Sequence, residues 1–499
     1  MTTSTSLAPA GPPGPALSDT LPYPQQLHRT MGRFASFAAG FSFISVLTTV
    51  FQLFAFGYGT AGPAFVWTWP VVLVGQLLVA ACFAELAARY PISGAIYQWA
   101  TRLANPTYGW FTGWLMVLGQ VVVVTAAALA LQVVLPALWS GFQLVGGDPS
   151  PTTASGAANA VLLGTALIVL TTVVNAVDNR VLSRVNGIGV VAELAGIVLI
   201  VVLLFTHTEQ PASVVLHTGH TGGGAFWALL VGSFTAAYVM IGFDSAGELS
   251  EETVAPRRTA PRTVLTALAA AGAGGGLLLL GGVLAAPSLT DGRLATEGLS
   301  YVLTSSLGDG LGRVLLADVA VAICVGTLAM QTAGTRMVFS MARDGALPGA
   351  GRLASVHRRS GMPRWAALAV GVPAAAFLLL NLVSPAAFLA LSTTCIVLVY
   401  AAYALVVGAL LVRRLRGLPI GEDGAAADET GRPLFSLGRW ALPVNVLALV
   451  YGVAMTVNLA WPRASVYDPQ GGHWYFRWFS VLVPAGAVLL GAVYRRLRR

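Results

Sequence analysis

The chain alternates long apolar runs with short polar connections. Twelve of the runs have the length of a membrane-spanning helix, which needs about 20 predominantly apolar residues. They lie at roughly 34–56, 64–88, 109–138, 156–177, 183–206, 226–252, 262–287, 311–341, 363–382, 385–412, 440–460 and 476–494. The pattern therefore predicts an all-α polytopic membrane protein with twelve transmembrane helices.

The sixth run is interrupted. It opens as an ordinary apolar span and then reads Gly-Phe-Asp-Ser-Ala-Gly at 242–247. An ionised Asp at a helix centre costs roughly 2.5–3.5 kcal/mol on insertion scales, so Asp244 needs a wet cavity, a partner or a ligand. Gly242 and Gly247 make local unwinding easier. Many secondary transporters build a midplane binding site in this way, although a buried acid bonded to nearby backbone N–H groups is the simpler alternative.

The first run carries a polar stripe. Its members share one helical face and are Ser42, Ser45, Thr48, Thr49 and Gln52. Hydroxyls in membrane helices often bond back to their own backbone, and this is one interpretation of the stripe. The other interpretation is a binding-site lining that faces the break in the sixth run. Paired breaks in spans 1 and 6 predict two five-helix repeats of opposite topology, spans 1–5 and 6–10.

Composition agrees with a membrane protein. The 499 residues are 56% hydrophobic and 10% charged, whereas soluble domains carry about 25% charged residues. The basic residues lie mainly in alternate connections, which predicts that both termini are cytoplasmic and that the number of spans is even. Membrane orientation accounts for the net charge of +8, so no nucleic-acid partner is expected. The inner (plasma) membrane and its lipid bilayer are the expected location.

The same pattern divides the chain into five parts. We expect a disordered cytoplasmic tail at 1–28, a first repeat at 29–206, a second repeat at 207–414, a cytoplasmic loop at 415–438, and spans 11–12 with a basic C-terminus at 439–499. The three cysteines, Cys82, Cys324 and Cys395, lie singly in apolar runs without metal-ligand spacing. No metal, cofactor or enzymatic activity is expected.

Four stretches together resemble the amino acid–polyamine–organocation (APC) superfamily, most closely its amino acid/choline permease branch. They are GFSFISVLTTVF at 40–51, FAELAARYPISGAIYQWATRLANPTYGWFTGW at 83–114, GFDSAGELSEET at 242–253 and TRMVFSMARDGALP at 335–348. The resemblance implies a leucine-transporter-type 5+5 inverted repeat plus two extra helices. It also implies transport of amino acids, polyamines, 4-aminobutyrate or choline.

The resemblance assigns roles to several residues. Leu47, Thr48 and Thr49 occupy the positions of the unwound segment of span 1, where relatives often carry glycine, so Thr49 is a departure. Tyr238 matches an aromatic residue that closes over the substrate. Glu193, in span 5, matches a position at which some proton-coupled relatives carry a lysine. Because an ionised carboxylate is costly there, Glu193 is a candidate proton carrier, with a neutral structural hydrogen bond as the alternative.

These considerations define the expected site. Its substrate-binding members are Ser45, Leu47, Thr48, Thr49, Tyr238, Gly242, Phe243, Asp244 and Tyr400. Free backbone N–H groups at the break in span 1 would receive a substrate carboxylate, because no arginine is expected in mid-membrane. Asp244 and nearby carbonyls would hold an ammonium group, while Tyr238 and Phe243 exclude water.

Charged residues nearer the cytoplasm are assigned to gating or structure. Glu85 and Arg89 are spaced as an i,i+4 ion pair at the inner end of span 2. Glu248, with Glu251 and Glu252, is expected to form a solvated inner-gate cluster.

The predicted function is secondary active transport of an amino acid or a related small amine, such as 4-aminobutyrate or a neutral or cationic amino acid. Alternating access would be coupled to a proton, to sodium or to exchange. Choline or another quaternary amine is the rival substrate. A substrate-gated channel or membrane sensor is the alternative from a different class.

Overall fold

The computed structural model describes residues 27, 29, 31–177, 179–218, 224–357, 360–383, 387–421, 427–428, 431–467 and 474–498. The expected tail at 1–28 lies almost wholly outside the described residues, as does part of the expected loop at 415–438. Within the described ranges every regular element is a helix. Two isolated β-bridges, Met31–Thr253 and Ala427–Pro433, are the extended backbone pairings in these ranges.

The longer helices of the first half begin with α1 (Arg33–Ile44), α2 (Val46–Ala61), α3 (Thr68–Arg89) and α4 (Ala95–Leu103). They continue with α5 (Pro106–Leu129), α6 (Leu131–Leu138), α7 (Ala154–Val177) and α8 (Asn179–Thr206). Those of the second half are α9 (Ala225–Val239), α11 (Pro256–Leu284), α13 (Leu299–Arg343), α15 (Arg364–Leu378), α17 (Ala387–Leu415), α18 (Ala441–Ala460) and α21 (Phe479–Leu497). The four-residue α10 (Ser245–Glu248) lies between α9 and α11. Short helices and turns complete the connections.

Ten segments of the described chain are long and apolar enough to cross a membrane. One of them, Arg33–Arg89, is 57 residues long and contains α1, α2 and α3. Because a crossing needs about 20 residues, this segment has room for two. A further apolar helix, α9, has only 15 residues and is continued by a break and by α10. The protein is a multi-pass, all-helical membrane protein, and the number twelve stays a prediction.

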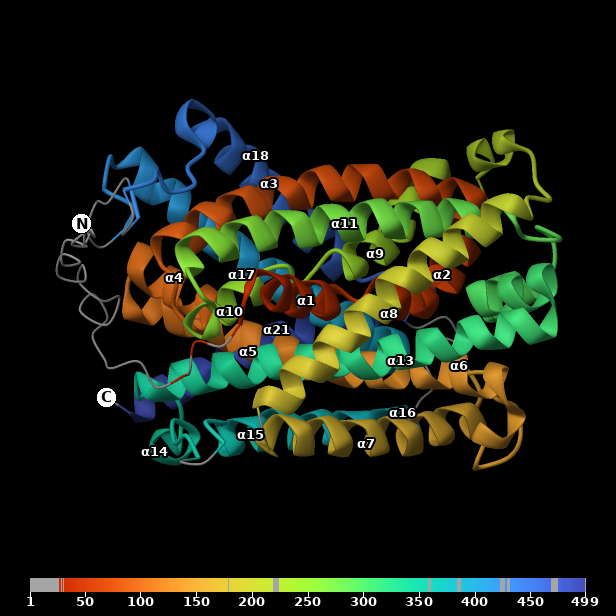
Figure 1. Cartoon of the computed structure of the whole chain (residues 1–499), viewed down its shortest axis with the longest axis horizontal. Coiled ribbons are helices and arrows are strands. Elements are labelled where there is room, and N and C mark those ends of the chain that lie inside the picture. Colours follow the sequence, from red (N-terminus) through yellow and green to blue (C-terminus); the bar gives the residue numbers. More distant parts are fainter. Residues whose placement is uncertain are drawn as a thin grey trace, which may run out of the picture.

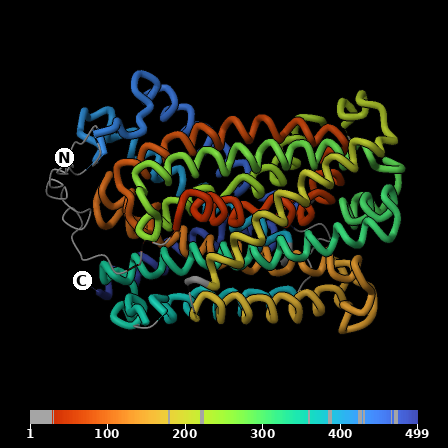
Figure 2. Tube along the Cα trace, in the orientation of Figure 1, coloured from red at the N-terminus to blue at the C-terminus, as the bar shows by residue number. Residues whose placement is uncertain are grey.

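The interrupted helices lie in the middle of the bundle (Figure 1). Helix α2 packs along α9, while α1 packs against α8, α11 and α13. Helices α3 and α11 lie side by side above this centre in the view, and α7 pairs with α15 at the lower edge (Figure 1). The trace in Figure 2 shows the same order, with α1 and α2 (red) enclosed by later segments. The interrupted helices are thus shielded on several sides.

The outer helices have an apolar surface. Val169 and Leu170 of α7, Val198 of α8, and Leu489 and Leu490 of α21 are all exposed. Polar residues such as Gln76, Gln120 and Asn175 are instead fully buried. Apolar residues outside and polar residues inside are what a hydrocarbon solvent selects.

The first break is at Ser45. This residue separates α1 from α2 and has φ 40° and ψ 78°, in the left-handed region that is uncommon for residues other than glycine. The expected unwound residues Leu47, Thr48 and Thr49 lie instead in the first turn of α2, where the Thr49 N–H bonds to the Ser45 carbonyl at 3.0 Å. The prediction placed the break about two residues too late. One strained residue suffices to redirect the chain. A longer unwound segment is therefore not needed.

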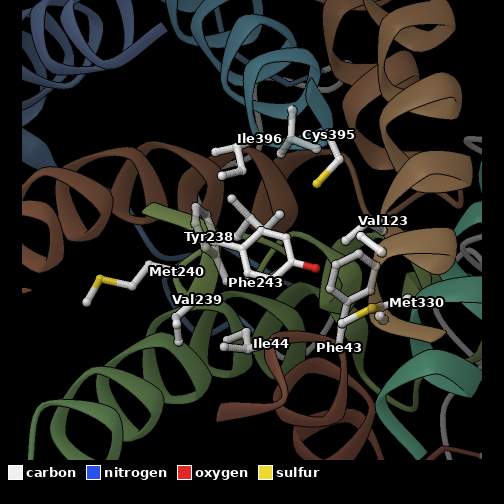
Figure 3. Close-up of a cluster of buried hydrophobic side chains, with 14 of the residues drawn as sticks. Phe43, Ile44, Val123, Tyr238, Val239, Met240, Phe243, Met330, Cys395 and Ile396 are labelled. Carbon is white, nitrogen blue, oxygen red and sulfur yellow. The ribbon is translucent and has the colours of Figure 1, made fainter. Parts of the chain in front are cut away.

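The second break lies between α9 and α10. Gly242 has φ 90°, and a Cβ built on it would lie 1.7 Å from Cδ1 of Phe43, two residues before the first break. The two breaks are therefore in direct contact. Figure 3 shows Phe43 and Ile44 from α1 gathered with Tyr238, Met240 and Phe243 from the second interrupted segment. Glycine is required at 242 both by the backbone conformation and by this contact.

We expect Gly242→Ala to lower the free energy of unfolding by more than about 2 kcal/mol, because it adds a side chain at positive φ and displaces Phe43. Unfolding of the purified protein in detergent, followed by heat or denaturant, measures the change. Gly187→Ala is the matched control, since a Cβ there meets nothing within 4 Å. Equal stability of the two variants would show that the break tolerates a side chain.

Candidate functional site

The start of α2 is held by a carboxylate from α8. Oε1 of Glu193 accepts hydrogen bonds from the Leu47 N–H and the Ser45 hydroxyl, each at 3.2 Å. Glu193 is 1% exposed, and its Oε2 has no hydrogen-bond partner among the described residues. The first N–H groups of a helix lack intrahelical partners and favour an anion. Glu193 therefore occupies part of the helix terminus that was predicted to receive a substrate carboxylate.

The neighbours of Glu193 come from α1, α2 and α13. The Ser45 hydroxyl also lies 2.6 Å from that of Thr48 and 3.4 Å from the Ala322 carbonyl of α13. Asp318 of α13 packs against Gly196, one turn beyond Glu193 on α8, and its Oδ2 has no partner among the described residues. Nothing in the sequence places Asp318 beside Glu193, because the two residues lie on different helices.

Asp244 is fixed by Tyr403 of α17. The Tyr403 hydroxyl donates to Oδ1 of Asp244 and accepts the Gly242 N–H at 3.0 Å. One side chain therefore satisfies one oxygen of the acid and the free N–H at the break. Asp244 is 1% exposed, and its Oδ2 has no hydrogen-bond partner among the described residues. The last carbonyl of the broken helix, Met240, accepts from Gln76 of α3 at 2.9 Å.

Aromatic rings pack around this acid. The centroids of Phe243 and Tyr403 lie 5.2 Å apart, and Phe83 lies 5.0 Å from Tyr403 and 5.8 Å from Phe243. Tyr238 is 1% exposed, and its hydroxyl has no partner within the described part of the chain. Figure 3 shows Tyr238 directed toward Val123 and Met330, among apolar side chains. The acid thus lies in a dry, largely aromatic setting.

Tyr400 lies apart from this arrangement. Its hydroxyl lies 3.2 Å from that of Tyr451 on α18, and the two rings pair with centroids 6.2 Å apart. The prediction selected Tyr400 for the site, whereas the contact with Asp244 is made by Tyr403, one helical turn further on. Both tyrosines lie on one side of α17, so spacing alone does not distinguish them.

Two buried ion pairs lie beyond the second break and connect the chain after α10 to α13. Glu252 binds Arg336 of α13 through two contacts of 2.6 and 3.3 Å, and Glu251 binds Arg343 through contacts of 2.7 and 2.9 Å. Glu248 is fully buried, and neither carboxylate oxygen has a hydrogen-bond partner among the described residues. The expectation of a solvated glutamate cluster is wrong, because the arginines and the chain before α4 cover it.

Arg336 was missed by sequence reasoning, which expected no arginine in mid-membrane. It is fully buried in α13, inside a candidate membrane span. An arginine within an apolar run predicts an acidic partner, since it is costly without one. That signal was available, but the sequence does not say which acid on which helix supplies the partner.

Glu85 and Arg89, which were expected to pair with each other at the end of span 2, contact other residues instead. Glu85 forms its ion pair with Arg414 of α17 at 2.5 Å, and its other oxygen lies 3.3 Å from the Ser436 hydroxyl. Arg89 donates to the carbonyl of Ile420 at 3.4 Å. Both residues therefore connect α3 to α17 and to the chain before α18. The expected pair within one helix is thus replaced by an ion pair between two helices.

Three buried threonine hydroxyls of α13, which could otherwise join a sodium site, bond to carbonyls of their own helix. Those of Thr327, Thr332 and Thr335 each lie 2.7–2.8 Å from a carbonyl four residues earlier in α13. Thr332 also contacts Asn175 of α7 at 2.8 Å. These bonds are the ordinary role of threonine in membrane helices.

Two broken helices that meet inside a membrane, with buried acids at the breaks, define a membrane transport protein of the broken-helix kind. A family model described as amino acid permease matches residues 30–485, and the chain belongs to this family and to the APC superfamily. The sequence is 27% identical to an amino-acid permease BAT1 of Arabidopsis thaliana, covering 89% of this chain and 87% of that protein. It is 26% identical to a methylthioribose transporter of Bacillus subtilis, covering 68% and 74%.

The family expectation is confirmed, and with it a transporter for amino acids is supported over an enzyme. A BAT1 homolog of rice is 27% identical, with 91% of this chain and 88% of that protein covered. None of these relatives carries choline in its name.

We expect Tyr403→Phe to lower the free energy of unfolding by about 1–3 kcal/mol, because it leaves the buried Gly242 N–H and one Asp244 oxygen without their hydroxyl partner. Tyr400→Phe is the matched control, since it removes only the hydroxyl that meets Tyr451. Unfolding of both purified variants gives the comparison. A loss of equal size in the two would contradict a special role for Tyr403.

Proposed function

We propose that the protein is a secondary active transporter that carries an amino acid or a related small amine across the plasma membrane by alternating access. The observation that carries this proposal is the contact between the two breaks, with Glu193 at the first and Asp244 at the second. Twelve spans in a 5+5 inverted repeat with two extra helices, and cytoplasmic termini, are part of the same proposal. The arginines of the connections support that orientation.

Asp244 is the proposed partner of the substrate ammonium group. Its Oδ2 is buried and unpaired within the described chain, beside Phe243 and Tyr403. A carboxylate in a dry setting attracts a cation strongly, and the surrounding rings add cation–π attraction. An amine therefore suits this end of the site, whereas a second carboxylate would be repelled.

Glu193 is the proposed proton carrier. Its ionised form is stabilised by the N-terminus of α2, but it lies in a dry interior in which a negative charge is costly. Protonation would weaken its hold on the Leu47 N–H and leave the helix terminus to a substrate carboxylate. Substrate and proton would then bind together, which is the requirement for coupled uptake.

Choline remains the rival substrate. A quaternary ammonium donates no N–H bond and is bound instead by aromatic rings. Phe83, Phe243 and Tyr403 surround Asp244, which favours either kind of cation. Binding of 4-aminobutyrate, neutral amino acids, choline and methylthioribose to the purified protein would separate these classes. Tightest binding of the uncharged sugar would exclude the amine proposal.

We expect Asp244→Asn to weaken amine binding by more than tenfold, which is about 1.4 kcal/mol, because it removes the charge and keeps the shape. Thermal-shift titration or calorimetry with the best amine of the screen measures the affinity. Asp291→Asn, at an exposed ion pair with Arg293, is the control. An unchanged affinity would remove Asp244 from the site.

We expect Glu193→Gln to abolish uptake driven by an acid outside solution while exchange of labelled substrate continues. Proteoliposomes that contain the purified variant allow both measurements, with Glu209→Gln in the exposed connection after α8 as the control. Acid-stimulated uptake by the Glu193 variant would refute the proton role. Saturable counterflow would support a carrier, whereas unitary currents would indicate a channel.

A further inference from the structure

The proposed function leaves one acid beside Glu193 without a role. Asp318 comes from α13, and a Cβ built on Gly196 of α8 would lie only 1.7 Å from its Oδ2. Gly196 follows Glu193 by three residues, so the two positions are neighbours on one face of α8. The lack of a side chain at 196 therefore leaves the space that the Asp318 carboxylate occupies.

Leu47, at the start of α2, lies close to both acids. Its N–H donates to Oε1 of Glu193 at 3.2 Å, and its Cδ1 lies 3.4 Å from the same built Cβ at Gly196. The carboxylates of Glu193 and Asp318 thus approach one residue of the first break from two helices. They are close enough for their negative charges to repel each other when both are ionised.

Both acids keep a buried oxygen without a partner. Oε2 of Glu193 and Oδ2 of Asp318 accept no hydrogen bond from a described residue, and Glu193 is 1% exposed. Neither acid forms an ion pair within the described chain. Gly196 lies about 15 Å before the end of α8 at Thr206, so the connection beyond that end is distant from both acids. Buried carboxylate oxygens that lack partners are costly as charges.

Charged side chains of the surrounding helices lie at other levels. Helices α1, α2, α7, α11 and α13 pack against α8. On α13, Arg313 is exposed and pairs with Asp309, while Cys324 carries no positive charge. Leu47 marks the level of the two acids on α2, and Gly274, which lies against Ile197, marks it on α11. The other ionisable residues of these helices and of α8 are more than two turns from this level along their helices, and they are Arg33, Tyr58, Arg180, Arg184, Arg257, Arg258, Arg262, Tyr301, Arg336 and Arg343.

We propose that Glu193 and Asp318 form a carboxyl pair that holds one proton in this arrangement, with Asp318 as a positioning residue that acts through Glu193. Two neighbouring carboxylates cannot both ionise at low cost in a dry interior, so one proton is retained. Hydrogen bonds from the Leu47 N–H and the Ser45 hydroxyl favour the charge on Glu193, which leaves the proton on Asp318.

The consequence for transport rests on the proposed function. A substrate carboxylate at the start of α2 would take the donors that stabilise the charge of Glu193. The proton then moves from Asp318 to Glu193 and the negative charge moves to Asp318, so the pair keeps one proton and one charge. A pair without the proton would carry two charges and repel the substrate carboxylate. Binding of the substrate therefore requires the proton.

The test compares Asp318→Asn and Glu193→Gln with the wild type, as full-length purified proteins in a neutral detergent. The free energy of unfolding is measured across pH in potassium buffers at constant ionic strength, with and without sodium. Asp309→Asn removes an exposed charge from the same helix as Asp318 and is the control. Asp318→Ala replaces Asp318→Asn if that variant does not fold.

We expect the stability of the wild type and the control to fall as the pH rises, because the folded pair retains a proton that the unfolded chain releases. In Asp318→Asn and in Glu193→Gln the fall should end at a pH lower by about one unit, which is a tenfold weaker hold on the proton. In proteoliposomes, half-maximal stimulation of uptake by acid should move to lower pH by a similar amount in Asp318→Asn, with an unchanged KM at saturating acid.

Two results would overturn the pair. One is a stability profile of Asp318→Asn that follows the wild type at every pH. The other is stabilisation of the wild type by sodium without dependence on pH, since a metal ion would then neutralise the acids. Failure of the proposed function is a separate result. Uptake that does not respond to acid would refute proton coupling, while the stability profile would still decide whether the pair holds a proton.

Discussion

A helix that breaks inside a membrane exposes backbone groups that water cannot reach, and the protein must supply their partners itself. Here the partners are side chains from three other helices. Glu193 of α8 accepts the Leu47 N–H, Tyr403 of α17 accepts the Gly242 N–H, and Gln76 of α3 donates to the Met240 carbonyl. The need for these partners places α3, α8 and α17 around the two breaks.

The buried ion pairs obey the same rule for charge. Breaking a buried pair on one side leaves an uncompensated charge and costs about 3–5 kcal/mol, so Glu252 and Arg336 must stay together wherever the interior is dry. They connect the chain after α10 to α13, below the second break. These contacts therefore favour this one arrangement of the chain after α10 against α13. Separating the two segments would require water to replace these contacts.

The sequence predicted the breaks better than their partners. Gly242 and Asp244 stand out because a carboxylate and a glycine are costly in an apolar run, and the polar stripe of the first span marks the other break. Tyr403 could not be chosen over Tyr400, since its contact with Asp244 joins residues 159 positions apart. The Ser45 pivot was also hidden, because its left-handed backbone depends on packing, including close contact with Gly326 of α13. The sequence shows where a polar residue or a glycine is costly in an apolar run. It does not show which distant residue will contact it.

The two acids lie in different surroundings. The difference bears on how binding of a substrate would be linked to binding of a proton. Asp244 is held by one hydroxyl and faces aromatic rings, so a cation can approach its free oxygen without displacing a backbone contact. Glu193 occupies a helix terminus, so an anion can bind there only if Glu193 gives up that contact. A zwitterion that bridges the two breaks would satisfy Asp244 directly but would compete with Glu193 for the start of α2. On the proposed function, a proton on Glu193 removes that competition, and uptake of the zwitterion therefore becomes linked to uptake of the proton.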